Sequence, residues 1–328
     1  MQNLELIPCD APFWADSGHA QTLWGHFLKS PELDSPGESF DVTLPDGDKL
    51  LCFYHPGTTD TVVSLYHGLS GDMQADYMQR TAILCRQLGH TVVLVNHRGA
   101  GPGITTARHP YHSGRAEDVS EVIKVLRHKF LGKKQIAVGY SMSGCIVLCL
   151  GGGFRGEHKP DGIITVNAPL NLGRGARTLG TGLNRIYDVR FVHRLRQNID
   201  FKYRMGLIDQ TYHIPWWATV HELDRIYTAP ASGFRDRDDY YDSCSAIHYL
   251  HNVDVPTYML TAADDPFVIV QDYKDATMSS NISLHIEQRG GHLGYLAKNK
   301  TPLGSNRWLD YYLREAIQKM TEEFTAGS

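Results

Sequence analysis

Near the middle of the chain, residues 135–144 read Gln135-Ile136-Ala137-Val138-Gly139-Tyr140-Ser141-Met142-Ser143-Gly144. An apolar run typical of a buried strand ends here in a tight turn, and an apolar run compatible with a helix follows it. A sharp turn from a strand into a helix forces a serine to the edge of a sheet, where its hydroxyl is exposed. Because the turn is crowded, the positions around Ser141 must be small, and Gly139, Ser143 and Gly144 satisfy this condition. The stretch therefore predicts a nucleophilic serine.

Strand-like and helix-like segments alternate on both sides of Ser141. Apolar runs predict buried strands at 61–66, 91–95, 136–138, 163–166, 257–261 and 282–286. Helices are expected at 77–88, 116–129, 143–150 and 308–324. Two earlier strand-like runs, 39–44 and 50–55, flank an Asp-Gly pair, which is a hairpin signal. The repeated alternation predicts an α/β fold with a doubly wound, mostly parallel sheet.

The alternation stops between residues 167 and 247. This stretch is too long for a simple connection between two core strands. We therefore expect a helical insertion that lies over the mouth of the sheet as a cap, with residues 1–166 and 248–328 forming the two parts of the core. The alternative is a lengthened pair of peripheral helices without a function of its own.

Composition argues against several classes of protein. A formal net charge of −4 disfavours a nucleic-acid-binding protein, which needs a strongly basic face. No window approaches the roughly 18 apolar residues of a membrane span, and residues 1–10 lack the features of a signal peptide. The six cysteines form no Cys-x-x-Cys pair and are expected to be buried thiols. We therefore expect a cytoplasmic protein without an integral membrane segment, of an oligomeric state that the sequence does not indicate.

Downstream of Ser141 the chain offers an acid and a base in suitable places. A serine hydroxyl attacks well only when a base, commonly a histidine held by a carboxylate, removes its proton. The strand predicted at 257–261 runs directly into Asp264-Asp265, and the strand at 282–286 leads to the loop Gly290-Gly291-His292. On a sheet of this kind the three groups follow the chain order serine, acid, histidine. The order predicts a catalytic set of Ser141, one of the two aspartates, and His292.

Two backbone amides are candidates for an oxyanion hole, which must aim donors at the charge of the tetrahedral intermediate. One is the N–H of Met142, the residue after the proposed nucleophile. The other is expected in the loop Tyr66-His67-Gly68-Leu69, which follows an earlier apolar strand, and is assigned to Leu69. We interpret His67 as a buried histidine that braces this loop.

Taken together, the motifs resemble those of the YheT-like branch of the α/β-hydrolase superfamily. They extend over nearly the whole chain and comprise Gly18-His19-Ala20-Gln21-Thr22, His67-Gly68-Leu69-Ser70-Gly71, Asn96-His97-Arg98-Gly99, Tyr111-His112-Ser113-Gly114, residues 139–144, Asp238-Asp239-Tyr240-Tyr241, Ala263-Asp264-Asp265-Pro266-Phe267 and Gly290-Gly291-His292-Leu293-Gly294-Tyr295. The resemblance implies one hydrolase domain with a helical cap and Ser-Asp-His esterase activity. Eukaryotic members of this branch include esterases and phospholipases that act on lipids. In the family the serine is usually followed by Leu-Gly-Gly, where this chain has Met142-Ser143-Gly144.

The resemblance favours Asp265 as the acid. Asp265-Pro266-Phe267-Val268 matches the Asp-x-x-Val turn that usually carries the acid in this superfamily. Asp264 is then expected to cap the turn or the helix that follows. The choice between the two aspartates stays open at this point, and substitution of each by asparagine separates them.

These observations predict a carboxylesterase-type serine hydrolase acting on a small-molecule ester. Ser141 attacks, His292 transfers the proton, Asp265 orients His292, and the amides of Leu69 and Met142 bind the oxyanion. Since the ordinary pKa of a histidine is about 6.5, activity is expected to rise from acid to neutral pH. The alternatives are a thioesterase, phospholipase or amidase with the same groups, or a hydrolase-fold protein that binds a ligand without cleaving it.

The substrate is expected to carry an apolar or lipid-like acyl group. This expectation rests on the aromatic residues of the cap, which could equally form its core: Trp216, Trp217, Tyr227 and Phe234. Arginines of the cap are interpreted as a solvated face, with contact to an anionic headgroup as the alternative: Arg174, Arg177 and Arg185.

No metal and no organic cofactor are expected. The histidine pairs His109/His112 and His248/His251 lack a third ligand. The motif Asn96-His97-Arg98-Gly99 is interpreted as fixing the turn at the end of a strand.

Overall fold

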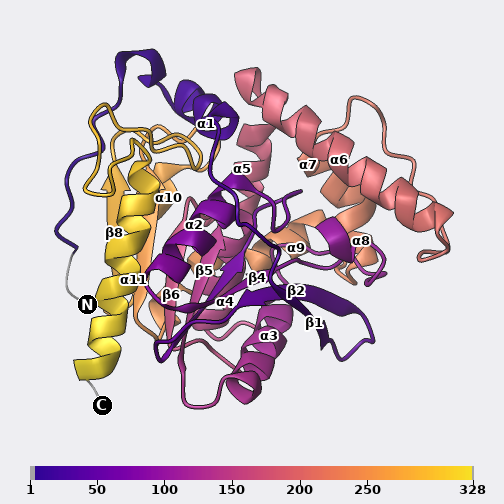
Figure 1. The fold of residues 1–328 in the computed structure, drawn as a ribbon. Coiled ribbons are helices and arrows are strands. Elements are labelled where there is room, and N and C mark those ends of the chain that lie inside the picture. The colour runs from indigo at the N-terminus through magenta and orange to yellow at the C-terminus, as the bar shows by residue number, and fades with distance from the viewer. Residues whose placement is uncertain (1–3, 327–328) are drawn as a thin grey trace.

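The computed structural model describes residues 4–326 (Figure 1). Residues 1–3 and 327–328, which the expected core segments include, lie outside the described residues. The centre of the fold is an eight-stranded sheet in the order β1-β2-β4-β3-β5-β6-β7-β8. Its strands are β1 (Glu38–Thr43), β2 (Lys49–His55), β3 (Thr61–Tyr66), β4 (Thr91–Val95), β5 (Lys134–Tyr140), β6 (Gly162–Val166), β7 (Thr257–Ala262) and β8 (Ile282–Glu287).

The prediction of a mostly parallel, doubly wound sheet is confirmed. The pairs from β4 through β3, β5, β6 and β7 to β8 are all parallel, whereas β1–β2 and β2–β4 are antiparallel. The Asp-Gly turn closes the β1–β2 hairpin, in which Thr43 pairs with Lys49. All residues of β3, β4, β6 and β7 are buried, which explains their nearly continuous apolar runs.

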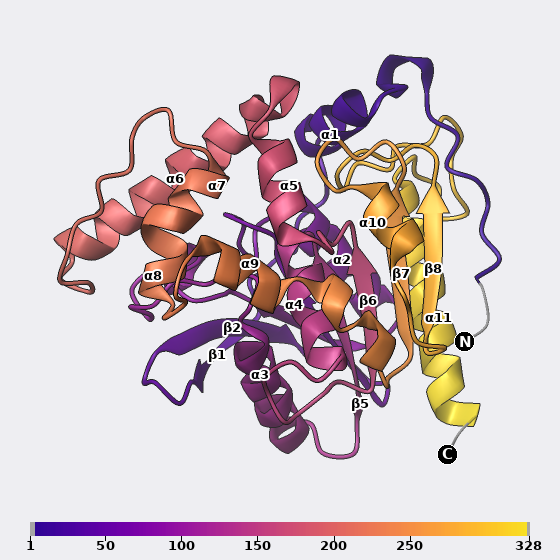
Figure 2. The same ribbon diagram turned by 180° about the vertical axis from the view of Figure 1, so that it is seen from behind.

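Helices cover both faces of the sheet (Figures 1 and 2). α2 (Asp76–Gln87) and α11 (Trp308–Ala326) pack on one face, and α3 (Ala116–Lys129) and α4 (Met142–Gly151) pack on the other. The bounds of α3 are those predicted, because its apolar residues recur at helical spacing and are buried on one side. The parallel strands consequently end together at one edge, where the loops that follow them meet.

Between β6 and β7 the described chain forms helices and no strand. They are α5 (Leu172–Leu179), α6 (Arg185–Arg204), α7 (Val220–Leu223), a π-helical turn (Asp224–Thr228), α8 (Ala229–Ala231) and α9 (Arg237–Cys244). α6 lies on the side toward which the parallel strands point (Figure 2). It contacts the loop after β4, where Asn198 Nδ2 donates to the carbonyl oxygen of Gly99 at 2.8 Å.

Short helical turns join several of these elements. They are Phe13–Ala15, Gly101–Gly103, Gly182–Asn184, Ala246–His248 and Leu250–Asn252. None of the helices in residues 4–326 combines the length and the apolar character needed to cross a bilayer.

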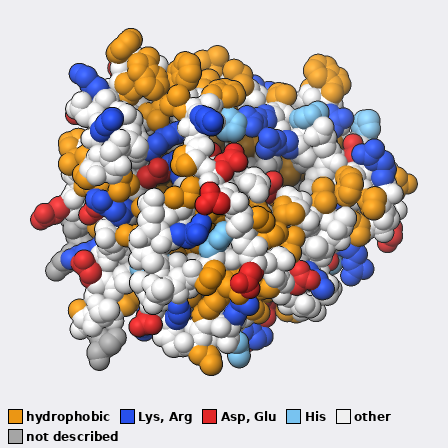
Figure 3. All heavy atoms as spheres, in the orientation of Figure 1, with side chains coloured by type: hydrophobic (Ala, Val, Ile, Leu, Met, Phe, Trp, Pro, Cys, Tyr) orange, Lys and Arg blue, Asp and Glu red, His pale blue; other side chains and the backbone are white. Residues whose placement is uncertain are grey.

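Two helices, α1 (Gly18–Phe27) and α10 (Val270–Asp275), are not predicted by the sequence patterns. α1 reverses the usual pattern, because it buries Gln21 completely and exposes Trp24 and Phe27 by 47% and 68%. Exposed apolar side chains gather over this part of the surface (Figure 3). Gln21 is buried because it donates to the carbonyl of Leu296 at 3.0 Å and accepts the N–H of the same residue at 2.7 Å. Hydrophobic periodicity cannot reveal a helix that is held by such polar contacts.

Candidate active site

Ser141 stands at the turn between β5 and α4. Its φ of 51° and ψ of −121° form a strained conformation for a residue with a side chain. A Cβ on Gly139 would lie 2.5 Å from the carbonyl oxygen of Ser143, and a Cβ on Gly144 would lie 2.7 Å from Cβ of Ala168. Glycine is therefore required at both positions, and the turn can hold the Ser141 hydroxyl at the edge of the sheet.

The side chains of Ser141, His292 and Asp265 form a hydrogen-bonded chain. His292 Nε2 lies 2.9 Å from Ser141 Oγ, and His292 Nδ1 lies 2.8 Å from Asp265 Oδ2. The side chain of Asp265 is fully buried, and that of His292 is 9% exposed. Since a carboxylate only accepts hydrogen bonds, Nδ1 carries the proton and Nε2 faces the serine as an acceptor. The structure thus brings together the three side chains singled out in the sequence.

The Asp265 carboxylate has three further donors. Its Oδ1 accepts the N–H groups of Phe267 at 3.0 Å and Val268 at 2.9 Å, and its Oδ2 accepts a bond from Asn167 Nδ2. Asn167 directly follows β6, and its own Oδ1 accepts a bond from the Tyr295 hydroxyl at 2.7 Å. Asn167 is not predicted as a site residue, because its only signal in the sequence is an asparagine at the end of an apolar strand. Its amide fixes the carboxylate plane and hence the direction in which Oδ2 meets the imidazole.

Asp264 has a different role from the one expected. Its Oδ1 accepts the N–H groups of Gly290 and Gly291, at 2.9 Å each, instead of capping its own turn or the following helix. These two amides are partly buried in a loop without secondary structure, so they need an acceptor. Asp264 therefore holds the loop that carries His292.

Residues of α1 and of the loop after β7 also position His292. The His292 N–H donates to Thr22 Oγ1 at 2.8 Å, and the Thr22 hydroxyl donates to the carbonyl of Gly18 at 2.7 Å. The ring of Phe267 lies 4.2 Å from the imidazole, centroid to centroid. The motif at residues 18–22 thus contributes to the site through the backbone of His292.

The two amides predicted for an oxyanion hole lie beside Ser141. Met142 is the first residue of α4, a position whose N–H has no acceptor within the helix. Leu69 follows Gly68, and a Cβ built on Gly68 would lie 3.2 Å from Cβ of Ser141. Both Leu69 and Met142 line the same cavity as Ser141.

The interpretation of His67 as a buried brace is confirmed. Its Nδ1 donates to the carbonyl of Gly68 at 2.8 Å, and its Nε2 accepts the N–H of His97 at 3.2 Å. Burial lowers the pKa of His67 to about 4, so the ring is neutral at physiological pH. The Ser143 hydroxyl donates to the His67 carbonyl and lies 2.7 Å from His97 Nε2. Serine in place of the family's glycine therefore links the turn at Ser141 to the loop that contains Leu69.

A cavity opens at Ser141. Its wall combines the loops after the strands with helices α5, α6, α7 and α9. Most of the lining is apolar, including Leu69, Met142, Leu172, Ala176, Leu179, Phe191, Leu195, Ile199, Val220, Leu223, Phe267 and Val268. Polar residues also reach the wall, among them Arg98, Asn198, Lys202 and Asp224. A mainly apolar group fits such a lining.

The expectation for the cap aromatics is wrong for two of the four residues. Trp216 and Trp217 are 83% and 54% exposed and do not line the cavity. Tyr227 does line it, whereas Phe234 is buried against the rings of His112 and Tyr240. The presence of an aromatic residue in the sequence does not tell whether it lines the cavity, lies on the surface or packs in the core, because aromatic residues occur in all three places.

Two of the three cap arginines are paired with carboxylates. Arg174 forms an ion pair with Asp272, and Arg185 forms one with Asp188. Neither guanidinium appears on the cavity wall.

Comparisons with known proteins agree with this fold. The model of the α/β-hydrolase fold family matches residues 61–298, which is more than half of the chain. The chain therefore belongs to the α/β-hydrolase fold family.

Among the relatives is YheT of Escherichia coli (strain K12), which is named as a candidate esterase. It is 28% identical over 277 residues, with 82% of this chain and 81% of the relative covered. Phospholipase ABHD3 of Mus musculus is 26% identical over 322 residues, with 94% and 78% covered. Monoacylglycerol lipase ABHD2 of Danio rerio is 24% identical over 315 residues, with 86% and 72% covered. The resemblance to YheT-like α/β-hydrolases is confirmed.

Solved structures share the fold at low sequence identity. The esterase Pf2001 of Pyrococcus furiosus superposes with a TM-score of 0.59 at 12% identity, covering 90% of this chain and 97% of that chain. Mouse α/β-hydrolase domain-containing protein 10 gives a TM-score of 0.54 at 15% identity, covering 88% and 100%.

Proposed function

We propose that this protein is a serine hydrolase that cleaves carboxylic esters through an acyl-enzyme. The observation that carries the proposal is the chain of contacts from Ser141 Oγ through the imidazole of His292 to Asp265. A hydroxyl, an imidazole and a carboxylate at these distances have the geometry required for nucleophilic catalysis by serine.

The reaction proceeds in two steps. In the first, Ser141 Oγ attacks the ester carbonyl while His292 Nε2 takes the hydroxyl proton, and the imidazolium then gives this proton to the departing alcohol. In the second, a water molecule attacks the acyl-enzyme in the same way, and the acid and the free serine are released. Asp265 holds the Nδ1–H of His292 and stabilises the imidazolium formed in both steps.

The amides of Leu69 and Met142 serve as the oxyanion hole in this proposal. Both residues line the cavity beside Ser141, and their amides donate to the carbonyl oxygen as it becomes negatively charged. The strained turn at Ser141 and the bond from Ser143 to the His67 carbonyl keep the two amides in place before the substrate arrives.

The acyl part of the substrate is an apolar or lipid-like group. The mainly apolar wall of the cavity beside Ser141 supports this assignment. The names of two relatives, a phospholipase and a monoacylglycerol lipase, point in the same direction. In the same proposal, the helices in residues 167–247 form a cap, since α5, α6, α7 and α9 supply much of this wall.

Labelling with a fluorophosphonate probe tests the proposal. The wild-type protein should be labelled and should hydrolyse p-nitrophenyl esters of medium-length acids. The variant Ser141→Ala should lose the label and at least about 10⁴-fold in kcat/KM, because the nucleophile is gone. Ser70→Ala, a serine of the neighbouring loop with φ of 55°, controls for nonspecific labelling.

A label that persists in Ser141→Ala, or equal hydrolysis by both proteins, would refute the proposal. A matched panel of oxygen esters, thioesters, amides and phospholipids with one acyl chain then identifies the preferred leaving group, since all four would use the same three side chains.

A further inference from the structure

A buried lysine on the cavity wall is not used by the proposed reaction and, unlike the buried Arg98 on the same wall, forms no ion pair among the described residues. Lys202, near the carboxyl end of α6, lines the same cavity as Ser141 and is only 2% exposed. Its ammonium nitrogen approaches two carbonyl oxygens, of Arg108 at 3.5 Å and of His109 at 3.3 Å. Both distances exceed the 2.7–2.9 Å usual for hydrogen bonds from charged donors. Within the described residues, no carboxylate oxygen lies within 4.0 Å of Nζ.

The backbone leaves room for this ammonium group. Gly99, which follows β4, has a φ of 63°, and a Cβ at this position would lie 2.7 Å from Nζ and Cε of Lys202. Asn198, one helical turn before Lys202, bonds the carbonyl of the same glycine at 2.8 Å. The amine is therefore held at the wall by the fold and not by a carboxylate.

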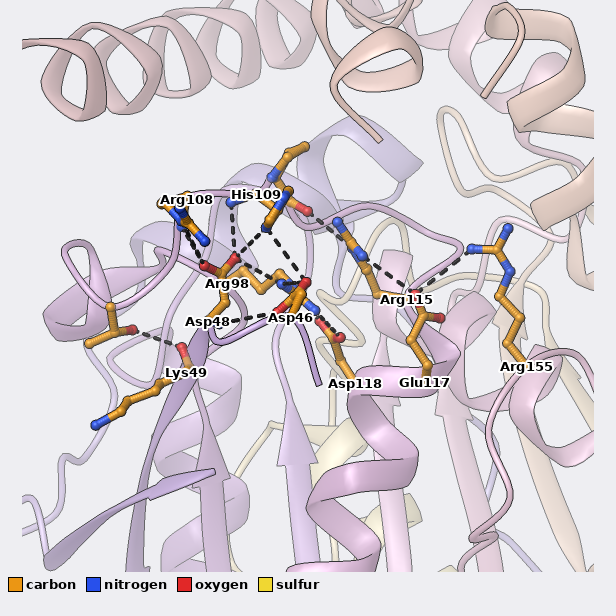
Figure 4. Close-up of polar contacts among 12 residues, drawn as sticks. Asp46, Asp48, Lys49, Arg98, Arg108, His109, Arg115, Glu117, Asp118 and Arg155 are labelled. Carbon is orange, nitrogen blue, oxygen red and sulfur yellow. Dashed lines mark hydrogen bonds and ion pairs between the residues drawn. The ribbon is translucent and has the colours of Figure 1, made fainter. Parts of the chain in front are cut away.

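The nearest carboxylates are already bonded to another cation. Figure 4 shows Arg98 at the centre of three aspartates. Its Nη1 lies 2.7 Å from Asp46 and 2.8 Å from Asp48, while Nε and Nη2 lie 2.6 and 2.7 Å from the two oxygens of Asp118. Asp48 Oδ2 also accepts the backbone N–H of His109 at 3.0 Å and lies 2.9 Å from its ring nitrogen Nδ1. These acceptors attract Lys202 only at longer range.

The same cluster contains a group with metal-like spacing. Ligand atoms of Asp46, Asp48 and His109 lie within 4.8 Å of one another. However, the guanidinium of Arg98 is bonded to both carboxylates, so this cation already balances the charge that a metal ion would meet. The cluster is therefore interpreted as structural.

Asp224 is the acidic residue on the cavity wall. It is 8% exposed, and its Oδ2 accepts a bond from the Tyr241 hydroxyl at 2.8 Å. No ion pair joins it to Lys202 among residues 4–326. A charged group buried without a close partner is costly, and burial lowers the pKa of Lys202 to about 8, against a smaller opposing effect of Asp48. The amine is still mostly protonated at pH 7.

We propose that Lys202 binds an anionic oxygen group of the substrate, a carboxylate or a phosphate, while the ester bond lies at Ser141. The substrate class is thus an amphipathic ester with an apolar stretch and an anionic end. This inference rests on the proposed function for the position of the ester bond. The ammonium supplies up to three donors, and a bound anion would give it the close, charge-assisted partner that the described part of the chain does not provide.

Paired substrates test the inference. One pair is a p-nitrophenyl monoester of octanedioic acid and the same ester with its free carboxylate methylated. The other is a 1-acylglycerol 3-phosphate and the monoacylglycerol with the same chain. For at least one pair, we expect the wild-type kcat/KM to favour the anionic member by roughly tenfold or more. The pair that shows the preference tells whether a carboxylate on the acyl side or a phosphate on the alcohol side is bound.

Variants at position 202 connect the preference to the ammonium. In Lys202→Met and Lys202→Gln, the anionic-to-neutral ratio should fall by at least about tenfold, because the charge is lost. Arg204→Met removes one positive charge from an exposed position of the same helix and should keep the wild-type ratio. Near-UV circular dichroism establishes that each variant is folded. A wild type that favours the neutral member of both pairs, or a ratio unchanged in both Lys202 variants, would overturn the inference.

Binding to the inactive variant separates this inference from the proposed function. For at least one of the two pairs, Ser141→Ala should bind the anionic member about tenfold more tightly than the neutral member, and Ser141→Ala/Lys202→Met should bind both members equally. If hydrolysis is absent from the wild type but this difference in Kd remains, the ester chemistry is wrong and the anion site stands. If hydrolysis is present and the difference is absent for both substrate pairs, the anion site is wrong.

Discussion

Two polar clusters lie where the strands of the sheet end, one around Ser141 and one around Arg98. In the Arg98 cluster, all six carboxylate oxygens of Asp46, Asp48 and Asp118 accept hydrogen bonds. At Ser141 the hydroxyl has one side-chain partner among the described residues, His292, and it borders the cavity. Both clusters are built from charged and polar groups on loops, yet only one has capacity left for a ligand.

The difference shows how to separate structural from reactive polar groups. Burial of a charge is tolerated when every donor and acceptor is satisfied, and such a cluster holds loops together. Burial alone would lower the pKa of Arg98, but Asp118 and Asp46 raise it above that of an ordinary arginine. Groups that retain unused hydrogen-bonding capacity beside a cavity can instead change partners during a reaction.

The largest effect is expected at the acid of the Ser141 cluster. Asp265→Asn should lower kcat by about 10⁴-fold, because an amide cannot stabilise the imidazolium and favours the wrong tautomer of His292. Asp264→Asn is the matched control and should cost about tenfold or less, since it weakens only two bonds to the loop amides. Steady-state kinetics on one ester compares the two. The reverse order of effects would transfer the role of the acid to Asp264.

A large loss of stability is expected when the saturated cluster loses its cation. Arg98→Met leaves three carboxylates without their partner and should reduce the free energy of unfolding by about 3–5 kcal/mol. Arg108→Met is the control, because this side chain is 62% exposed and lies 3.9 Å from Asp48. Its effect should stay below about 1 kcal/mol. Urea unfolding measures both values, and similar losses would show that the cluster is not the stabilising unit described here.

The third and smallest effect concerns Asp224, which lies on the cavity wall and belongs to neither the Ser141 cluster nor the Arg98 cluster. Burial raises its pKa from 3.8 to about 6, partly offset by its bonds to Thr228 and Tyr241. The folded state therefore favours the protonated acid, and the stability that Asp224 contributes is present below pH 4 and lost as the pH rises through 6. Asp224→Asn should remove this loss and gain on the order of 2–3 kcal/mol relative to wild type between pH 4 and pH 7.

Unfolding curves at both pH values test this prediction. Asp238→Asn, at a carboxyl group that is 69% exposed, gives the background for removing one negative charge. If the difference between Asp224→Asn and wild type is independent of pH, Asp224 does not titrate in this range.

Much of the core could be predicted, because each strand and its helix leave a local signal. The run 61–66 is mainly apolar since both faces of β3 are covered, and α3 shows its buried side at helical spacing. α1 left no such signal because it buries Gln21 and exposes Trp24. The prediction that Trp216 lines the cavity or forms the core of the cap was wrong for a related reason. The sequence does not show whether an aromatic side chain is buried or exposed to solvent.

The site divides in the same way. Ser141 and His292 stand in turns that the local sequence indicates. Small residues lie two positions before and two positions after the serine, and two glycines directly precede the histidine. Asn167 reaches the site from the end of β6 and Thr22 from α1, and neither periodicity nor turn chemistry in the sequence predicts these two contacts. Their contribution depends on contacts between distant segments, since Asn167 and Asp265 are 98 residues apart in the chain, and Thr22 and His292 are 270 residues apart.

The sequence by itself determined the α/β architecture, the turn that exposes Ser141, and the order in which nucleophile, acid and histidine occur. Local periodicity and turn chemistry depend only on residues close together in the chain, so they can be identified from the sequence alone. Only the tertiary structure decided which aspartate meets His292, that three aspartates surround Arg98, and that Lys202 forms no ion pair with a carboxylate of residues 4–326. These are questions of which distant groups satisfy one another, and a hydrogen bond or an ion pair exists only once the packed core has fixed both partners.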